Sequence, residues 1–259
     1  MNDFHIIKSL FEQIQRYGDR TAVRYPQNGL WCDISWKKLG EQIRAAAQGM
    51  LAMGVREGEK VGIFSQNCPE WLVSDYAILA LRGVSVPIYA TNTPKQVAYI
   101  LHEAEIGILF VGGQEQYDNL RAMPGGGDEL RRIVVFDESV DLAGQRNAVR
   151  FREFLEEGRQ AGGEAAIDER LGRASMEDLA TLIYTSGTTG EPKGVMLHHE
   201  NFSHAFIAHK KRLDVSDRDI SMCFLPLSHI FERAWTFFAM SQGMVVACCD
   251  NTARIIEYL

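Results

Sequence analysis

The sequence predicts an α/β protein with mostly parallel sheets flanked by helices in two lobes. Short apolar runs at residues 61–64 and 84–89 have the length of buried strands. The segment between them, residues 71–81, is apolar nearly all round, which is typical of a buried helix. Strands that alternate with helices favour right-handed crossovers and a parallel sheet covered by helices on its faces.

The N-terminal residues predict a helix, a hairpin and a second helix. Apolar residues recur at helical spacing over residues 4–14. Two β-prone runs, at residues 21–25 and 30–34, flank Asn28-Gly29, a strong hairpin-turn signal. Ser35 then stands where it can cap the second helix.

The next elements are bounded by proline and glycine. Pro69 suits the first turn of the helix at residues 71–81, and Gly83 is expected to end that helix. Thr93-Pro94 predicts the start of another helix by the same cap chemistry. Two further apolar runs, residues 106–111 and 133–136, are predicted strands.

Two stretches interrupt this alternation and suggest where the chain divides. Residues 124–128, Pro-Gly-Gly-Gly-Asp, predict a loop without regular structure. Residues 156–178 are polar and predict a long surface connection. We therefore place a boundary near residue 172, between an N-terminal lobe of residues 1–172 and a second lobe of residues 173–259.

The second lobe also alternates strand and helix. Asn201 is expected to cap a helix over residues 202–211, and Ser228 to open another. Residues 220–225 and 245–248 are predicted strands. The chain stops inside an apparent helix from Thr252, which suggests a truncated polypeptide.

Composition narrows the function classes. A formal net charge of −7 without a basic run argues against a nucleic-acid surface. Five cysteines without C-x-x-C spacing predict reduced thiols in a cytoplasmic protein and no zinc site. The N-terminus lacks a signal-peptide core, and no apolar run is long enough to span a bilayer. Peripheral contact with a membrane stays open.

One stretch carries most of the chemistry. It follows the apolar run at residues 179–184 and combines hydroxyls, glycines and a lysine. Glycines allow backbone N–H groups to form a concave nest for anions, the hydroxyls donate to the same oxygens, and the lysine adds charge. A polyphosphate suits this chemistry. The residues predicted to hold it are Thr185, Ser186, Gly187, Thr188, Thr189, Gly190 and Lys193.

This stretch is not a Walker A loop. Pro192, and not glycine, precedes Lys193, and residues 195–197 continue as a second strand. The loop is therefore expected to join strand to strand. The competing interpretation is a flexible Gly/Thr surface turn.

A second stretch, residues 225–233, places ionisable groups directly after a strand. His229 would lie outside the carboxyl end of that strand, where open α/β sheets bind ligands. Glu232 and Arg233 are either an ion pair that braces a pocket or a surface pair on the helix. Trp235, with Phe237 and Phe238, either lines an apolar tunnel or belongs to the core. The other histidines form no convincing metal set.

These two stretches resemble known motifs. Tyr-Thr-Ser-Gly-Thr-Thr-Gly-Glu-Pro-Lys-Gly is similar to the phosphate loop of the adenylate-forming superfamily. Leu-Pro-Leu-Ser-His-Ile-Phe-Glu-Arg resembles the acyl-pocket motif of long-chain fatty acyl-CoA synthetases. The resemblance implies ATP, Mg²⁺, coenzyme A and a fatty acid as ligands. It also implies catalytic roles for Lys193 and His229 and substrate contacts for His229, Glu232 and Trp235.

The resemblance implies a reaction in two halves, through an acyl-adenylate to an acyl-CoA. Later motifs of the family are absent before residue 259, so we expect an N-terminal fragment that is inactive, or nearly so, alone. The alternatives are a non-catalytic nucleotide-binding module or another adenylate-forming enzyme. A phosphohydrolase ranks last, because the sequence shows neither the paired carboxylates nor the metal ligands that activate water.

Overall fold

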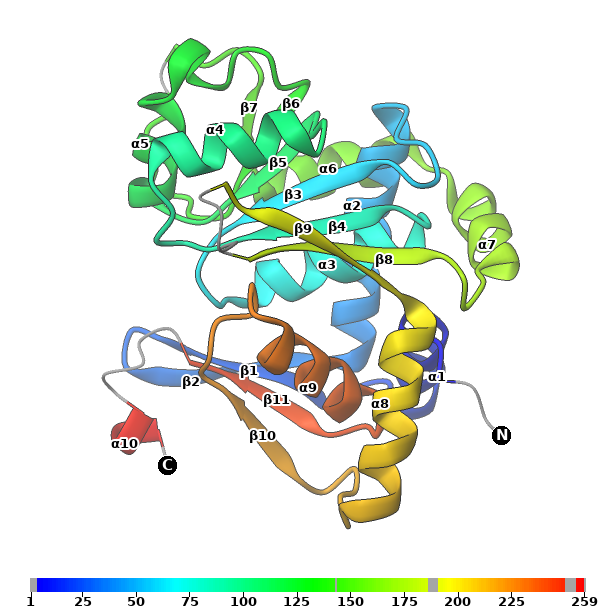
Figure 1. The fold of residues 1–259 in the computed structure, drawn as a ribbon. Helices are drawn as coiled ribbons and strands as arrows, with labels where there is room; N and C mark the ends of the chain where they lie inside the picture. Colours follow the sequence, from blue (N-terminus) through cyan, green and yellow to red (C-terminus); the bar gives the residue numbers. More distant parts are fainter. Residues whose placement is uncertain (1–3, 143, 186–190, 250–254, 259) are drawn as a thin grey trace.

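Two sheets and the helices between them make up the fold (Figure 1). The computed structural model describes residues 4–142, 144–185, 191–249 and 255–258. The strands are β1 (Thr21–Gln27), β2 (Leu30–Ser35), β3 (Lys60–Phe64), β4 (Val84–Ile88), β5 (Ile108–Val111), β6 (Arg132–Val135), β7 (Ala148–Arg150), β8 (Leu179–Thr185), β9 (Lys193–His198), β10 (Ile220–Cys223) and β11 (Val245–Cys248). The helices are α1 (Ile6–Tyr17), α2 (Trp36–Ala52), α3 (Pro69–Ala80), α4 (Pro94–Glu103), α5 (Gln114–Arg121), α6 (Phe151–Ala161), α7 (Glu164–Arg173), α8 (His199–Arg212), α9 (Ile230–Ser241) and α10 (Ile255–Tyr258).

The larger sheet has the order β7-β6-β5-β3-β4-β8-β9 and is parallel except for β9. The smaller has the order β10-β11-β1-β2, in which β11 runs parallel to both neighbours and β1 and β2 form the hairpin. The prediction of an α/β protein with mostly parallel sheets is confirmed. Each sheet contains strands from both sides of residue 172, so the two-lobe division is not a division between sheets and stays a prediction.

Helix α3 lies between the two sheets, because it contacts β1 of the smaller sheet and β3 and β4 of the larger one. This explains why it is buried on every side. A shared hydrophobic core joins α1, α2, α3 and α9. Helices α4 and α5 cover the opposite face of the larger sheet with a second core. The layers are therefore helix, sheet, helix and sheet.

Local turn and cap chemistry agrees with the sequence at several points. Asn28 and Gly29 adopt positive φ angles of 53° and 78° between β1 and β2. Ser35 accepts a hydrogen bond from the Lys38 N–H at the start of α2. Thr93 forms a capping box at the start of α4. These hairpin and cap predictions are confirmed.

One predicted loop is wrong, and a second contains a single 3₁₀ turn with non-helical φ angles inside it. Residues 156–178 contain the end of α6 and all of α7. Both helices bury apolar side chains, among them Phe154 and Ile167, and Gly162-Gly163 separates the two helices. Pro124–Gly127 forms a short 3₁₀ helix, in which Gly125 and Gly126 adopt positive φ angles. The polar composition of residues 156–178 led to the prediction of a loop, although their apolar residues have the spacing of amphipathic helices.

Two predicted helix ends also differ. Arg82, and not Gly83, is left-handed after α3, with a φ angle of 55°. Its guanidinium bonds to Asp178 at 2.8 and 2.7 Å, which helps to hold this conformation. Asn201 does not cap α8: the helix begins at His199, and Asn201 Oδ1 accepts from the His198 N–H at 2.8 Å. The helix predicted from Thr252 begins outside the described residues, which contain α10 from Ile255.

Candidate active site

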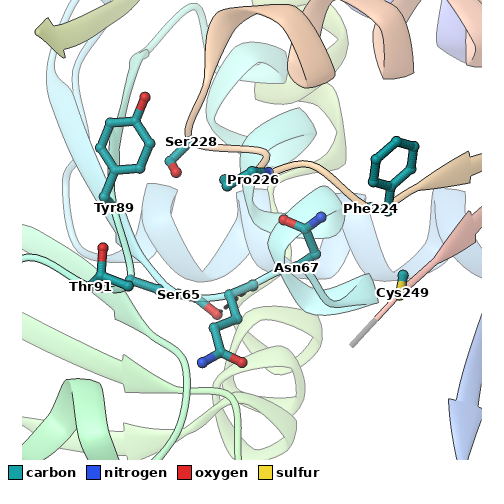
Figure 2. Close-up of a pocket in the computed structure, with 10 residues that line it drawn as sticks. Ser65, Asn67, Tyr89, Thr91, Phe224, Pro226, Ser228 and Cys249 are labelled. Atoms are coloured by element: carbon teal, nitrogen blue, oxygen red, sulfur yellow. Dashed lines mark hydrogen bonds between the residues drawn. The ribbon is translucent and has the colours of Figure 1, made fainter. Parts of the chain in front are cut away.

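A cavity of about 450 Å³ lies at the carboxyl ends of the parallel strands (Figure 2). One wall follows β3 and β4 of the larger sheet, and the other follows β10 and β11 of the smaller one. Parallel α/β sheets present ligand sites at this edge. The lining residues are Ser65, Gln66, Asn67, Tyr89, Ala90, Thr91, Phe224, Pro226, Ser228 and Cys249.

The strands that carry the predicted phosphate loop end beside this cavity. β8 and β9 are antiparallel, so the prediction that the loop joins strand to strand is confirmed. β8 is also parallel to β4, with Ser85 opposite Thr181, and four residues further along the chain Tyr89 follows the end of β4 and Thr185 ends β8. Tyr89 lines the cavity, so the loop begins next to it.

Thr185 and Lys193 stand at the base of the loop. They are register partners, and both are exposed. Cross-strand partners project from the same face of a sheet, so the hydroxyl and the ammonium lie on one side. Ser186, Gly187, Thr188, Thr189 and Gly190 lie outside the described residues, so their predicted contacts with phosphate stay predictions.

His229 is the N-cap residue of α9. Its Nδ1 accepts a hydrogen bond from the Phe231 N–H at 3.2 Å, so the proton of the neutral ring is on Nε2. The ring is exposed and therefore presents a hydrogen-bond donor at a helix N-terminus, where anions are stabilised. The prediction that Ser228 opens this helix is wrong, because His229 caps it. Ser228 lines the cavity instead.

Glu232 and Arg233 form neither of the predicted pairs. Arg233 is fully buried and donates to the Asp75 carboxylate at 2.9 and 2.5 Å. It also donates to Thr181 Oγ1 at 2.6 Å and lies over the rings of Trp71 and Phe237. Arg233 therefore joins α9 to α3 and to β8, across 158 residues of sequence in the case of Asp75.

Glu232 points at its own preceding loop. Its Oε2 accepts from the Leu225 N–H at 3.1 Å, and the residue is 3% exposed. This burial raises the pKa of the Glu232 carboxyl. Glu232 does not line the cavity, so the geometry favours an indirect role in which Glu232 holds the backbone of the loop between β10 and α9.

Trp235 lies elsewhere on α9. Its Nε1 donates to Ser221 Oγ on β10 at 2.7 Å, and its ring packs against His209 and Phe238. Phe237 and Phe238 are core residues. None of the three lines the cavity, and the predicted contact between Trp235 and substrate stays a prediction.

Sequence reasoning missed the half of the site that comes from the larger sheet. Ser65, Asn67, Tyr89 and Thr91 follow β3 and β4 and line the cavity. The available signal was their position after two predicted parallel strands, because such strands end at one edge of a sheet. These residues form no recognisable motif, so their position alone does not mark a site.

The described part of the chain holds neither a metal-binding cluster nor a membrane-spanning helix. Its His, Cys, Asp and Glu side chains nowhere gather in a group of three that could hold a metal ion. Among its helices, none has the length and apolar character needed to cross a membrane.

The fold and the cavity described above agree with the family that the sequence matches. The profile of the AMP-binding enzyme family matches residues 10–258, and the chain belongs to this family.

The chain is also similar to named ligases. It is 34% identical over 236 residues to the long-chain-fatty-acid–CoA ligase FadD15 of Mycobacterium bovis, covering 90% of this chain and 38% of the relative. It is 32% identical over 230 residues to the long-chain-fatty-acid–CoA ligase ACSBG2 of Xenopus laevis, covering 86% of this chain and 31% of the relative. The chain thus spans about a third of the length of these relatives.

Solved structures agree in fold. The anthranilate CoA ligase AuaEII in complex with anthranoyl-AMP superposes with a TM-score of 0.83 at 23% identity, covering 98% of this chain and 46% of that one. The N-terminal domain of FACL13 from Mycobacterium tuberculosis superposes with a TM-score of 0.78 at 21% identity, covering 98% and 59%.

Proposed function

We propose that this chain supplies the polyphosphate loop and part of the substrate pocket of an ATP-dependent long-chain fatty acid–CoA ligase. The observation that carries the proposal is the pairing of Thr185 with Lys193, the described ends of the predicted loop, on strands next to β4, which ends at a cavity at the carboxyl ends of both sheets. The fatty acid is proposed because relatives at 34% and 32% identity are long-chain-fatty-acid–CoA ligases.

In the proposed reaction, the fatty acid carboxylate attacks the α-phosphorus of ATP and pyrophosphate leaves. The thiol of coenzyme A then attacks the acyl carbonyl and releases AMP. The first half needs positioning and charge neutralisation more than covalent help. Lys193 is suited to neutralise charge on the departing pyrophosphate, and Thr185 to donate to a phosphate oxygen.

His229 is proposed to orient an anionic oxygen and not to remove a proton. Its Nδ1 is occupied by the Phe231 N–H, which leaves Nε2–H as a donor. A carboxylate or phosphoryl oxygen near the first turn of α9 would also benefit from the helix dipole.

Mg²⁺ is implied by the family's nucleotide chemistry, and the described His, Cys, Asp and Glu side chains form no group of three that would hold it by themselves. We therefore assign no described residue to this ion and derive no step through it. A cytoplasmic location is proposed from the odd number and irregular spacing of the cysteines. Peripheral membrane contact has no supporting observation.

Binding of inorganic tripolyphosphate tests the loop without needing an adenine site. Calorimetry should detect binding to the 259-residue chain. Lys193→Met should weaken it about tenfold, as expected for the loss of one charge-assisted contact. Lys95→Met removes an exposed charge on α4 and is the matched control. No binding, or equal weakening by both substitutions, would contradict the proposal.

A stable analogue of the acyl-adenylate separates a ligase from a non-catalytic nucleotide-binding module. A ligase site should bind palmitoyl-sulfamoyl-adenosine more tightly than AMP, because an enzyme binds analogues of the species that react in its site more tightly than it binds a product. Equal affinities would favour the module. Palmitate-dependent release of pyrophosphate by this chain alone is expected to be negligible, and robust turnover would refute the proposal that the chain is one part of the catalyst.

A further inference from the structure

The loop between β10 and α9 forms one wall of the cavity, and the backbone of its central residues is held by side chains. Pro226 has no N–H to donate. The Leu225 N–H donates to Glu232, as described above. The Leu225 carbonyl and the Leu227 N–H both bond to a single residue, Asn67.

Asn67 uses both ends of its amide. Nδ2 donates to the Leu225 oxygen at 2.7 Å, and Oδ1 accepts from the Leu227 N–H at 2.8 Å. Asn67 belongs to the loop after β3, 158 residues from Leu225 in the sequence. The two bonds therefore connect the cavity wall that belongs to the larger sheet with the wall that belongs to the smaller one.

The position of Asn67 in the cavity supports this role. Figure 2 shows its amide between Phe224 and Pro226, two of the residues that line the opposite wall. Asn67 also lines an adjoining cavity of about 590 Å³ at the ends of β3, β5 and β6, together with Ser65 and Gln66. It thus stands where the two cavities meet.

We propose that Asn67 is a positioning residue: it fixes the separation of the two cavity walls and thereby the placement of Ser228 and His229. The backbone groups at Leu225 and Leu227 would otherwise need new partners, because unpaired polar groups are costly. The proposed effect on ligand binding rests on the proposed function. The effect on the loop does not.

Hydrogen exchange of the Leu227 amide tests the clamp in the protein alone. Asn67→Ala removes its acceptor and should raise its exchange rate about tenfold, the size expected for one or two lost hydrogen bonds. Asn67→Asp keeps Oδ1 as an acceptor and should restore much of that protection. Asn119→Asp makes the same charge change at a half-buried position on α5, outside both cavity linings, and should leave exchange unchanged.

Binding of palmitoyl-sulfamoyl-adenosine tests the consequence for the site. Asn67→Asp cannot donate to the Leu225 oxygen, so both Asn67 variants should lose about tenfold in affinity, with urea midpoints close to that of the unmodified chain. Unchanged exchange in Asn67→Ala, or faster exchange with unchanged affinity, would overturn the inference. If the unmodified chain does not bind the analogue, the exchange result alone decides whether Asn67 clamps the loop, and the proposed function fails only if tripolyphosphate binding fails as well.

Discussion

Acidification is expected to destabilise this protein through one buried pair of histidines. His5, at the start of α1, and His199, at the start of α8, stack with ring centroids 4.0 Å apart. They are 5% and 2% exposed. Burial, assisted by Lys8, lowers the pKa of His5 to about 4. Burial, assisted by the neighbouring His5, lowers the pKa of His199 to about 3.

The sign of the effect follows from proton uptake. The ordinary pKa of a histidine is 6.5, so below that pH the two histidines are protonated in the unfolded chain. In the folded chain they stay neutral until the pH reaches about 4 or lower. Folding stability must therefore fall as the pH falls through this window. Between pH 7.5 and pH 5.0 each histidine should cost about 2 kcal/mol of unfolding free energy, and the pair about 4 kcal/mol.

Urea unfolding at the two pH values measures this. Other groups also titrate, among them Glu70 and Glu232 with raised pKa values, so the informative quantity is the change in the pH-dependent loss on mutation. His5→Asn and His199→Gln should each reduce that loss by about 2 kcal/mol, whatever they cost at pH 7.5. His102→Gln, at an exposed position on α4, should not reduce it. A loss that is unchanged in His199→Gln would refute the reasoning.

Two further predictions concern packing, and urea unfolding at pH 7.5 tests both. Arg233→Met leaves the Asp75 carboxylate buried without its partner and should lower the free energy of unfolding by about 3–5 kcal/mol. Lys38→Met breaks a half-exposed pair with Glu41 and should lower it by less than about 0.5 kcal/mol. Equal losses would contradict the burial of the first pair. In Gly158→Ala the new Cβ would lie 2.0 Å from the Ala45 oxygen of α2, so the protein should lose about 1–3 kcal/mol. The same change at Gly172, which faces open space on α7, should add up to about 1 kcal/mol, and a gain at both positions would show that α2 and α6 do not pack this closely.

The predictable parts of the fold depend on neighbours in sequence. The Asn28-Gly29 turn, the Ser35 cap and the Thr93 capping box each involve groups within a few residues of one another. Their chemistry can therefore be recognised without tertiary information. The exceptions are informative: Arg82 takes the left-handed position expected of glycine and is bonded there to Asp178, 96 residues away.

The candidate site divides in the same way. The phosphate stretch is recognisable because its hydroxyls, glycines and lysine lie within ten residues, and the strands on either side of it are as predicted. Arg233 could not be assigned from its neighbours, because its partner Asp75 is on another helix. Asn67 gave no sign of a role, because its two bonding groups are in a loop that only folding brings close.

The sequence by itself determined the α/β class and the strand pair that carries the predicted phosphate loop, because periodicity and local hydrogen bonding are short-range. Tertiary structure alone decided that β11 lies beside β1 and that the loops after β3 and β10 face each other across one cavity. The physical reason is that these arrangements depend on contacts between residues far apart in the chain. Burial of a shared core selects such contacts, and no local pattern encodes them.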